Sequence, residues 1–150
     1  MEDRIEQQIT INASLERVWE MVSEPGWWVP AKVVAPVDHT PGHQVVRESD
    51  KWGRFRIEVV RVEPKTYAAF RWASQFPGQE LRDGNTTLVE FSVEPIGTAV
   101  RVTVTESGFT KLEAPDSVRE DAWKSNTSGW QQELSGLKDR SEAPRSTRAE

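Results

Sequence analysis

Apolar and polar residues alternate along the first part of the chain, and this pattern predicts a strand. In residues 4–13 one face of the alternation carries Ile5, Gln7, Ile9 and Ile11. A period of two residues is typical of a β-strand with one buried face. We therefore expect the chain to begin with a half-buried strand.

Helical spacing begins after Ser14, whose hydroxyl can accept a hydrogen bond from the first turn of a helix. Apolar residues then recur three or four positions apart as far as the Pro25–Gly26 break, at Leu15, Val18, Trp19 and Val22. This spacing predicts a short amphipathic helix. The aromatic stretch 26–30 that follows is too brief for a long element and predicts a second helical turn or an aromatic loop.

Strand patterns fill the middle of the chain, and two turns allow the pairing of neighbouring strands to be predicted. A turn at 63–66 joins strands that pair Ile57 with Trp72, Val59 with Phe70 and Arg61 with Ala68. A second turn at 95–98 joins strands that pair Val89 with Val104, Phe91 with Val102 and Val93 with Val100. Two weaker strand patterns, at 32–37 and 44–48, flank the Pro41–Gly42 turn.

A long C-terminal helix is predicted from Pro115 and the capping-box pattern at 117–120 to about Lys138. Its apolar stripe passes through Val118, Ala122, Asn126, Trp130, Leu134 and Leu137, of which only Asn126 is polar. Residues 125–129 favour a helix poorly, so either the helix breaks there or close packing compensates. We expect one domain over residues 1–138 and a disordered tail over 139–150, which lacks large apolar side chains.

Composition narrows the class of protein. The chain has 150 residues, a formal charge of −5, no cysteine, and seven tryptophans beside a single tyrosine. The lack of cysteine excludes disulfides and thiolate metal sites; together with an acidic N-terminus and no long apolar run, it predicts a cytoplasmic protein without membrane insertion. Because the charges form no basic face, nucleic acid is not expected as a partner. The tryptophans predict an interior lined with large rings.

Several local patterns are specific in combination. They are Ile11-Asn12-Ala13-Ser14, Val18-Trp19, Trp27-Trp28, Pro64, Phe70-Arg71-Trp72, Gly97-Thr98, Glu106-Ser107-Gly108-Phe109, Asn126 and Gly129-Trp130. Together they resemble the START-like (SRPBCC) superfamily, and within it the bacterial single-domain proteins related to the activator of the heat-shock protein 90 ATPase. The resemblance implies an α+β helix-grip fold. In that fold a curved antiparallel sheet of about seven strands wraps a long C-terminal helix, in the order βααββββββα.

The same resemblance implies a deep cavity between sheet and helix, which members of the superfamily use for lipids, sterols, polyketides and other apolar molecules. On this basis we expect the walls and mouth of a ligand cavity to be formed by Trp27, Trp28, Phe70, Trp72, Phe91 and Trp130. Gly129 would leave space beside the ligand. The alternative is a filled core in which the same rings pack against one another.

Polar residues are predicted to face this interior. Glu106 keeps the parity of the inward valines of its strand, so burial should raise its pKa, and it is a weak candidate for a catalytic acid. Alternatively, it is solvated or fixes the turn at Gly108. Asn126 could offer its amide to a ligand or cap the backbone of residues 27–30. Arg61 shares a face with Ile57 and could pair with Glu106, although an arginine near a strand end more often reaches water.

No metal or other cofactor is expected. Asp38, His39 and His43 could be read as metal ligands, but Pro41 and Gly42 prevent a helix that would place both histidines on one face. An exposed turn is the simpler interpretation. The chain has no Gly-x-Ser-x-Gly pattern and its histidines lie in a loop, which argues against a Ser/His/Asp triad.

Three functions remain open from the sequence. The first is non-catalytic binding of a small hydrophobic ligand in an internal cavity. The second is a polyketide cyclase or aromatase-like enzyme, in which Glu106 and Asn126 would act on a substrate. The third is a chaperone-associated interaction domain that binds a protein partner through an exposed apolar patch. Loss of turnover in Glu106→Gln would separate the first two, and a protein partner would indicate the third.

Overall fold

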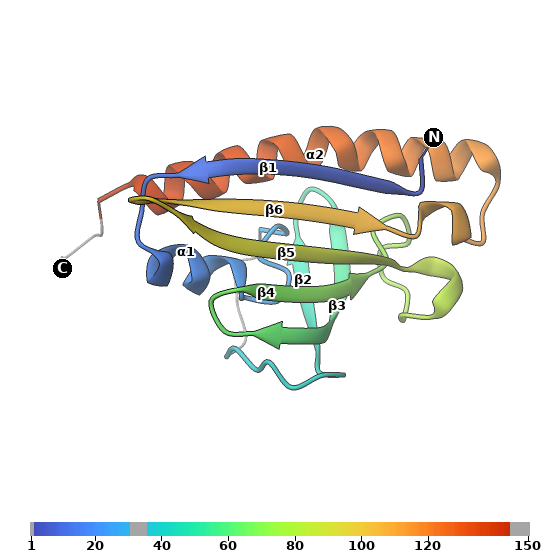
Figure 1. Cartoon of the computed structure of the whole chain (residues 1–150). Helices are drawn as coiled ribbons and strands as arrows, with labels where there is room; N and C mark the ends of the chain where they lie inside the picture. Colours follow the sequence, from blue (N-terminus) through green and yellow to red (C-terminus); the bar gives the residue numbers. More distant parts are fainter. Residues whose placement is uncertain (1, 31–35, 145–150) are drawn as a thin grey trace.

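A six-stranded antiparallel sheet wraps around a long helix (Figure 1). The computed structural model describes residues 2–30 and 36–144. The strands lie in the order β1-β6-β5-β4-β3-β2. Their bounds are β1 Arg4–Ile11, β2 Gln44–Ser49, β3 Gly53–Glu63, β4 Tyr67–Trp72, β5 Thr87–Ile96 and β6 Ala99–Ser107. The helices are α1 Leu15–Val22, α2 Asp116–Glu142 and the 3₁₀ turns η1 Asp83–Asn85 and η2 Phe109–Lys111. The predicted α+β helix-grip fold is confirmed.

The first strand and the first helix form as their spacing predicts. Ile5 and Ile11 of β1 are buried, whereas the alternate positions of the strand are exposed. At the start of α1 the hydroxyl of Ser14 accepts a hydrogen bond from the backbone N–H of Arg17, with an N–O distance of 3.2 Å. This cap satisfies one of the free donors of the first turn.

The number of elements differs from the prediction. Six strands form where about seven were predicted, and the predicted strand at 32–37 lies largely outside the described residues. The predicted second helix is absent from the described structure, because residues 24–29 form successive turns. In these turns Trp27 donates its backbone N–H to the carbonyl of Glu24, and Val29 donates to Gly26. Of the two interpretations of this stretch, the aromatic loop is correct.

The hairpin pairings agree with the prediction in part. Between β3 and β4, Ile57 pairs with Trp72 and Val59 pairs with Phe70, as predicted. A bulge then shifts the register, so that Arg61 faces Ala69 instead of Ala68. A bulge adds one residue to one strand and turns the following side chains. Arg61 is consequently exposed, and its ion pair is with Glu63 and not with Glu106.

The β5–β6 register is displaced by two residues from the prediction. Val89 pairs with Glu106, Phe91 with Val104 and Val93 with Val102. The cause is a tighter turn than the four-residue one predicted, because Ile96 pairs directly with Ala99. Gly97, the first of the two loop residues, has φ +60°, as a type II′ hairpin turn requires. The faces of the strands are unchanged, since a shift of two residues preserves the alternation.

Helix α2 is continuous through residues 125–129, where a break was considered. It begins at Asp116 after Pro115, and no side chain caps its first turn, so the predicted capping box does not form. It also runs past Lys138 to Glu142. There the guanidinium of Arg17 donates to the carbonyl of Ser141 at 2.6 Å, and Ser141 is buried. Helix α1 therefore fastens residues that were predicted to belong to a disordered tail.

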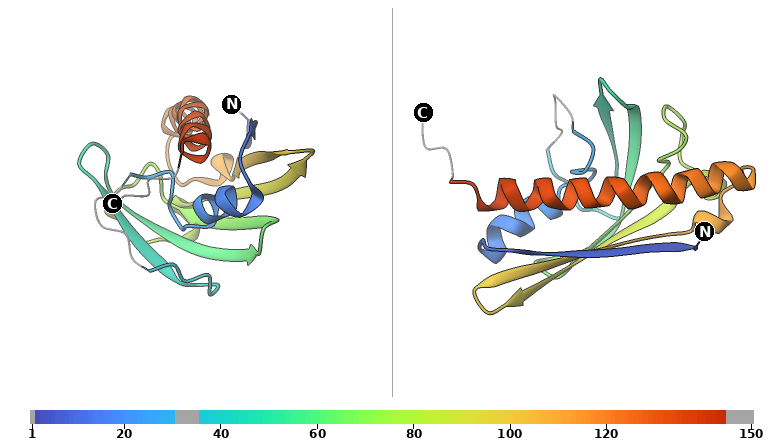
Figure 2. Two further views of the ribbon diagram at one scale, coloured as in Figure 1. Left: turned by 90° about the vertical axis from the view of Figure 1, so that its left-hand side faces the viewer. Right: turned by 90° about the horizontal axis from the view of Figure 1, so that it is seen from above.

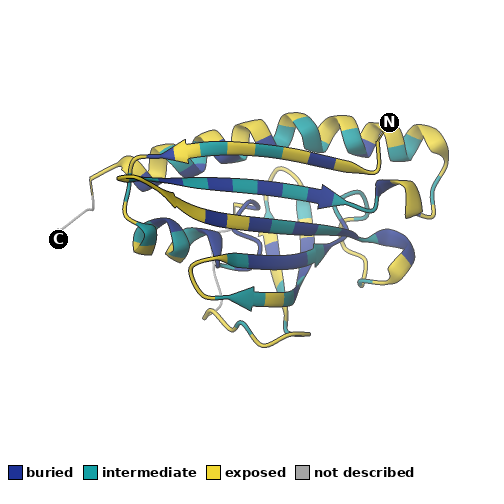
Figure 3. Ribbon diagram, in the orientation of Figure 1, coloured by how far each residue is buried: buried dark blue, intermediate teal, exposed yellow. Residues whose placement is uncertain are grey.

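The core lies between the concave face of the sheet and the two helices. Seen end on, the sheet curls beneath α2; seen from above, α2 runs alongside β1 and crosses the other strands (Figure 2). Buried and more exposed residues alternate along β5 and β6, which places one face of each strand in the core (Figure 3). No helix within residues 2–30 and 36–144 is long and apolar enough to cross a membrane.

Candidate functional site

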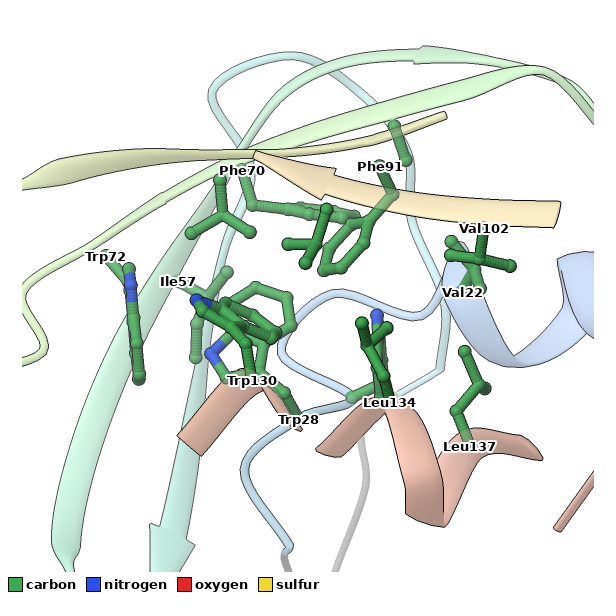
Figure 4. Packing of buried hydrophobic residues seen from close by; sticks show 14 of the residues in the cluster. Val22, Trp28, Ile57, Phe70, Trp72, Phe91, Val102, Trp130, Leu134 and Leu137 are labelled. Carbon is green, nitrogen blue, oxygen red and sulfur yellow. The ribbon is translucent and has the colours of Figure 1, made fainter. Parts of the chain in front are cut away.

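Six aromatic side chains meet between the sheet and α2, and we call them the aromatic cluster. They come from the loop after α1, from β4, from β5 and from α2, and all are buried: Trp27, Trp28, Phe70, Trp72, Phe91 and Trp130. Trp28 lies at the centre of the cluster, with its ring centroid 5.4 Å from that of Trp72 and 5.6 Å from that of Trp130 (Figure 4). Its centroid is also 5.5 Å from that of Phe91.

The rings of the aromatic cluster pack directly against one another. Trp27 and Trp28 meet edge to face, with centroids 6.1 Å apart and planes at 89°. Trp28 and Trp72 meet in the same way, at 88°. Such T-shaped contacts stabilise aromatic pairs beyond the burial of their surface. Direct contacts between the rings are typical of a filled core. The filled core was the alternative to an open cavity.

Glu106 lies at the end of β6 and is fully buried, as its parity predicts. Its carboxyl accepts hydrogen bonds from both indoles that flank it: Trp130 Nε1 donates at 2.8 Å and Trp72 Nε1 at 2.9 Å. Thr87 Oγ1 donates at 2.5 Å, and Asn126 Nδ2 lies 3.1 Å from each carboxyl oxygen. One acid thereby ties together β4, β5 and α2 at the edge of the aromatic cluster.

Burial raises the pKa of Glu106 above its ordinary value, and the hydrogen bonds from Thr87, Trp130, Trp72 and Asn126 offset part of this rise. No cation lies within ion-pair distance of its carboxyl among the described residues. Indole and amide N–H groups can donate but cannot accept. A proton on Glu106 Oε2 would therefore be donated to the hydroxyl of Thr87, which can accept it.

The raised pKa predicts that stability falls as the pH rises. Below the ordinary value of 4.5 the group is protonated in the folded and the unfolded chain, and its full contribution to stability is present. That contribution is lost as the pH rises through the folded pKa, by at most about 1.4 kcal/mol per pH unit. Glu133, whose pKa burial also raises, acts in the same direction.

Urea denaturation at a series of pH values from about 5 to about 8 measures this dependence. The matched variant is Glu106→Gln, which retains one accepting oxygen and cannot ionise. We expect the unfolding free energy of the variant to depend less steeply on pH than that of the unmodified chain. Parallel profiles for the two proteins would show that Glu106 does not titrate in this range.

The other predicted interior residues have different surroundings. Asn126 faces the sheet, and it donates to Glu106 and to Ser74 Oγ, the latter at 3.1 Å. Its amide nitrogen thus reaches the carboxyl of β6 and does not cap the backbone of residues 27–30. At Gly129 an added Cβ would meet no described atom within 4 Å. Close contact between helix and sheet is therefore not the reason for this glycine.

A buried arginine, which the sequence analysis did not single out, fastens the loop that carries Trp27 and Trp28. Arg47 of β2 donates from Nε to the carbonyl of Val29 at 2.8 Å, and from its guanidinium to Glu24 Oε2 at 3.0 Å. We call residues 24–29 the strap. The strap turns closely over this arginine, because Gly26 has φ +78° and an added Cβ would lie 2.5 Å from Arg47 Cδ.

Two polar atoms of the strap lack partners. The indole nitrogens Trp27 Nε1 and Trp28 Nε1 are buried and have no hydrogen-bond acceptor among the described residues. An unpaired buried donor costs roughly 1–3 kcal/mol. Both indole N–H groups are therefore able to donate to an oxygen atom that lies outside the described residues.

The histidine loop is arranged as a turn. His39 Nε2 lies 2.8 Å from the carbonyl of Ser23, and His43 Nδ1 lies 3.8 Å from Asp38. Within residues 2–30 and 36–144, no group of three or more histidine, aspartate or glutamate side chains could hold a metal ion. We derive no cofactor chemistry from this loop.

The chain is similar in sequence to one protein family. A family model described as "Activator of Hsp90 ATPase homolog 1-like protein" matches residues 12–142. No match was found among curated proteins.

Solved structures share the fold at low sequence identity. The Aha1 dimer from Colwellia psychrerythraea is 17% identical, with a TM-score of 0.71, over 95% of this chain and 98% of that one. Protein MLL2253 from Mesorhizobium loti is 20% identical, with a TM-score of 0.68, over 93% and 99% of the two chains. DynU16, a putative protein in the dynemicin biosynthetic locus, is 22% identical with a TM-score of 0.66, over 93% of this chain and 47% of that one.

Proposed function

The chain belongs to the Activator of Hsp90 ATPase homolog 1-like family within the START-like superfamily, as its sequence motifs predict, and we propose that it binds a small hydrophobic ligand in the cytoplasm. The site is the aromatic cluster between the sheet and α2. The observation that carries the proposal is the pair of buried indole N–H groups without acceptors, Trp27 Nε1 and Trp28 Nε1.

The chemistry of the site favours one class of ligand. The walls of the aromatic cluster are apolar, so the body of the ligand is apolar, preferably planar and able to stack on indole rings. The unpaired polar atoms are donors only, so the ligand supplies an acceptor oxygen such as a carbonyl or ether. The carboxyl of Glu106 is not free to accept from the ligand, because four side chains already donate to it.

Ligand entry requires Trp28 to move, because its ring occupies the centre of the aromatic cluster. The strap is suited to this movement, since residues 24–29 contain turns without helix or strand. Its hydrogen bonds to the sheet come from Arg47, which donates to Val29 and Glu24, while Trp27 and Trp28 hold it by ring packing alone. We therefore place the entrance at the strap.

Binding is favoured over catalysis by the surroundings of Glu106. A general acid or base needs its carboxyl within hydrogen-bond reach of the reacting group. Here the donors from Thr87, Trp72, Trp130 and Asn126 surround both oxygens. The carboxyl is thus placed to hold β6, β4 and α2 together around the aromatic cluster.

A matched pair of ligands tests the proposal. 2-Acetylnaphthalene and 2-ethylnaphthalene have nearly the same shape, but only the first has a carbonyl oxygen. We expect the ketone to bind more tightly and to change the tryptophan emission. Trp28→Phe removes the indole N–H and should weaken binding of the ketone about tenfold, with little effect on the hydrocarbon.

Trp52→Phe is the control variant, because Trp52 is 60% exposed at the β2–β3 turn and outside the aromatic cluster. It should leave both affinities unchanged. Emission titration and thermal shift give independent readouts. If fatty acids, sterols and aromatic ketones all leave emission and melting temperature unaltered, the proposal of a ligand site in the aromatic cluster is wrong and a protein partner becomes the better hypothesis.

A further inference from the structure

Strand β1 has a free edge whose backbone groups can be assigned from the ladder with β6. The sheet order places β1 at one edge. The backbone N–H of Gly108 donates to the carbonyl of Asp3 at 3.0 Å, so Asp3 and the odd-numbered residues of β1 bond to the β6 side. In an antiparallel pair, alternate residues point their N–H and C=O groups away from the partner strand. Arg4, Glu6, Gln8 and Thr10 therefore direct theirs to the free edge.

Helix α2 closes both ends of this free edge. At one end Trp123 Nε1 donates to the carbonyl of Arg4 at 3.2 Å. At the other, Glu142 Oε2 accepts the backbone N–H of Asn12 at 2.7 Å. Arg4 and Asn12 are both even-numbered, so both contacts fall on residues whose backbone groups point to the free edge. Between them the backbone N–H and C=O groups of Glu6, Gln8 and Thr10 have no partner among the described residues.

A groove lies between β1 and α2 and borders the first part of this open stretch, as far as Gln8. Its volume is about 720 Å³, and its lining from α2 consists of Trp123, Thr127 and Gln131. The lining from β1 includes both faces of the strand, from Arg4 to Gln8, as expected of a groove that follows the edge itself. We propose that this groove binds an extended peptide segment of a partner protein, which adds to β1 as a seventh strand.

The dimensions of the groove favour a peptide over a second copy of the chain. The open stretch from Glu6 to Thr10 is about 17 Å long at 3.4 Å per residue. Strand pairing over this length alone buries less than the roughly 800 Å² per partner that a stable dimer needs. A paired copy would also bring its own α2 alongside, because α2 runs beside β1 (Figure 2). Paired strands lie about 4.8 Å apart, whereas packed helices need about 8–10 Å.

The side chains of the groove indicate what the peptide should carry. Main-chain hydrogen bonds supply affinity in strand addition, and alternate side chains supply specificity. Trp123 is partly exposed in the groove and offers an apolar ring to one of these side chains. Arg4 and Glu6 form an ion pair on the opposite face, where they favour polar or charged residues of the peptide. The peptide is therefore extended, with one apolar side chain against Trp123.

The test uses the full chain and a displayed library of random ten-residue peptides. A selected peptide is synthesised, and its affinity is measured by fluorescence anisotropy. Gln8→Pro removes one N–H of the free edge without removing a bond to β6, and we expect it to weaken binding at least tenfold. Gln8→Ala keeps the N–H and is the matched control, with an affinity within twofold of the unmodified chain.

Backbone amide shifts in the unmodified chain give a readout that does not depend on the variants folding. The largest shifts on adding the peptide should fall on Glu6, Gln8 and Thr10. Failure to select any peptide, or shifts centred on another surface, would overturn the proposal. So would a dimer of the free chain that Gln8→Pro dissociates, because the occupant would then be a second copy. The proposal does not depend on ligand binding in the aromatic cluster, because none of the six cluster residues lines the groove.

Discussion

Replacing Trp130 with alanine is expected to lower the free energy of unfolding by about 4 kcal/mol. Trp130 is buried, and its ring lies beside those of Trp27, Trp28 and Phe91. Its truncation leaves a cavity in the aromatic cluster and removes a donor to Glu106. Because most domains have a total stability of only about 5–15 kcal/mol, this variant is expected to be close to unfolding.

Urea denaturation followed by far-ultraviolet circular dichroism measures this loss without relying on tryptophan emission. Trp52→Ala is the control, since Trp52 is exposed and should change stability by less than about 0.5 kcal/mol. An equal loss in the two variants would contradict the central role assigned to α2 in the core.

Replacing Glu106 with leucine is expected to lower the free energy of unfolding by about 4 kcal/mol as well. Leucine conserves most of the volume, so the loss measures the hydrogen bonds and not a cavity. Trp72 Nε1 and Trp130 Nε1 would both lose their acceptor, whereas Asn126 Nδ2 would keep Ser74 Oγ. Each buried donor left unpaired costs roughly 1–3 kcal/mol, which exceeds the gain from removing a buried acid.

Glu106→Gln provides the comparison for this second prediction. Its side-chain oxygen can still accept from Trp130, so the variant should lose less stability than Glu106→Leu. The opposite result, a leucine variant at least as stable as the unmodified chain near pH 7, would mean that burial of the charge outweighs its hydrogen bonds.

The sequence predicted the inward faces of the sheet better than its registers. Glu106 was predicted to face inward from its parity with Val104, and it is fully buried. Its partner across the sheet is Val89, although Val104 had been predicted to face that residue. Periodicity cannot detect this error, because a shift of two residues leaves the same side chains on each face. The conformation of Gly97 decides the register, and its φ cannot be deduced from the alternation.

The candidate site was predicted as a set of residues, while their contacts were not. The six rings do meet between sheet and helix, but apolar character alone does not distinguish a cavity wall from a ring packed against its neighbour. Arg47 was missed because a charged residue in a strand is usually exposed. The available signal was its position two residues after Val45, because alternate residues of a strand point to the same face and Arg47 pairs with Phe55. Thr87 begins its strand with the same parity as Val89, and the sequence analysis did not single it out.

The pairing of β1 with β6 has a consequence for synthesis of the chain on the ribosome. Arg4 lies opposite Ser107, so the strand made first obtains its ladder partner only when most of the chain has been translated. Trp28, another early residue, waits still longer for Trp130 of α2. Non-local contacts of this kind slow folding and leave apolar surface exposed in the meantime. The nascent chain therefore emerges with the Trp28 indole unprotected, and closure of the core waits until α2 has been made.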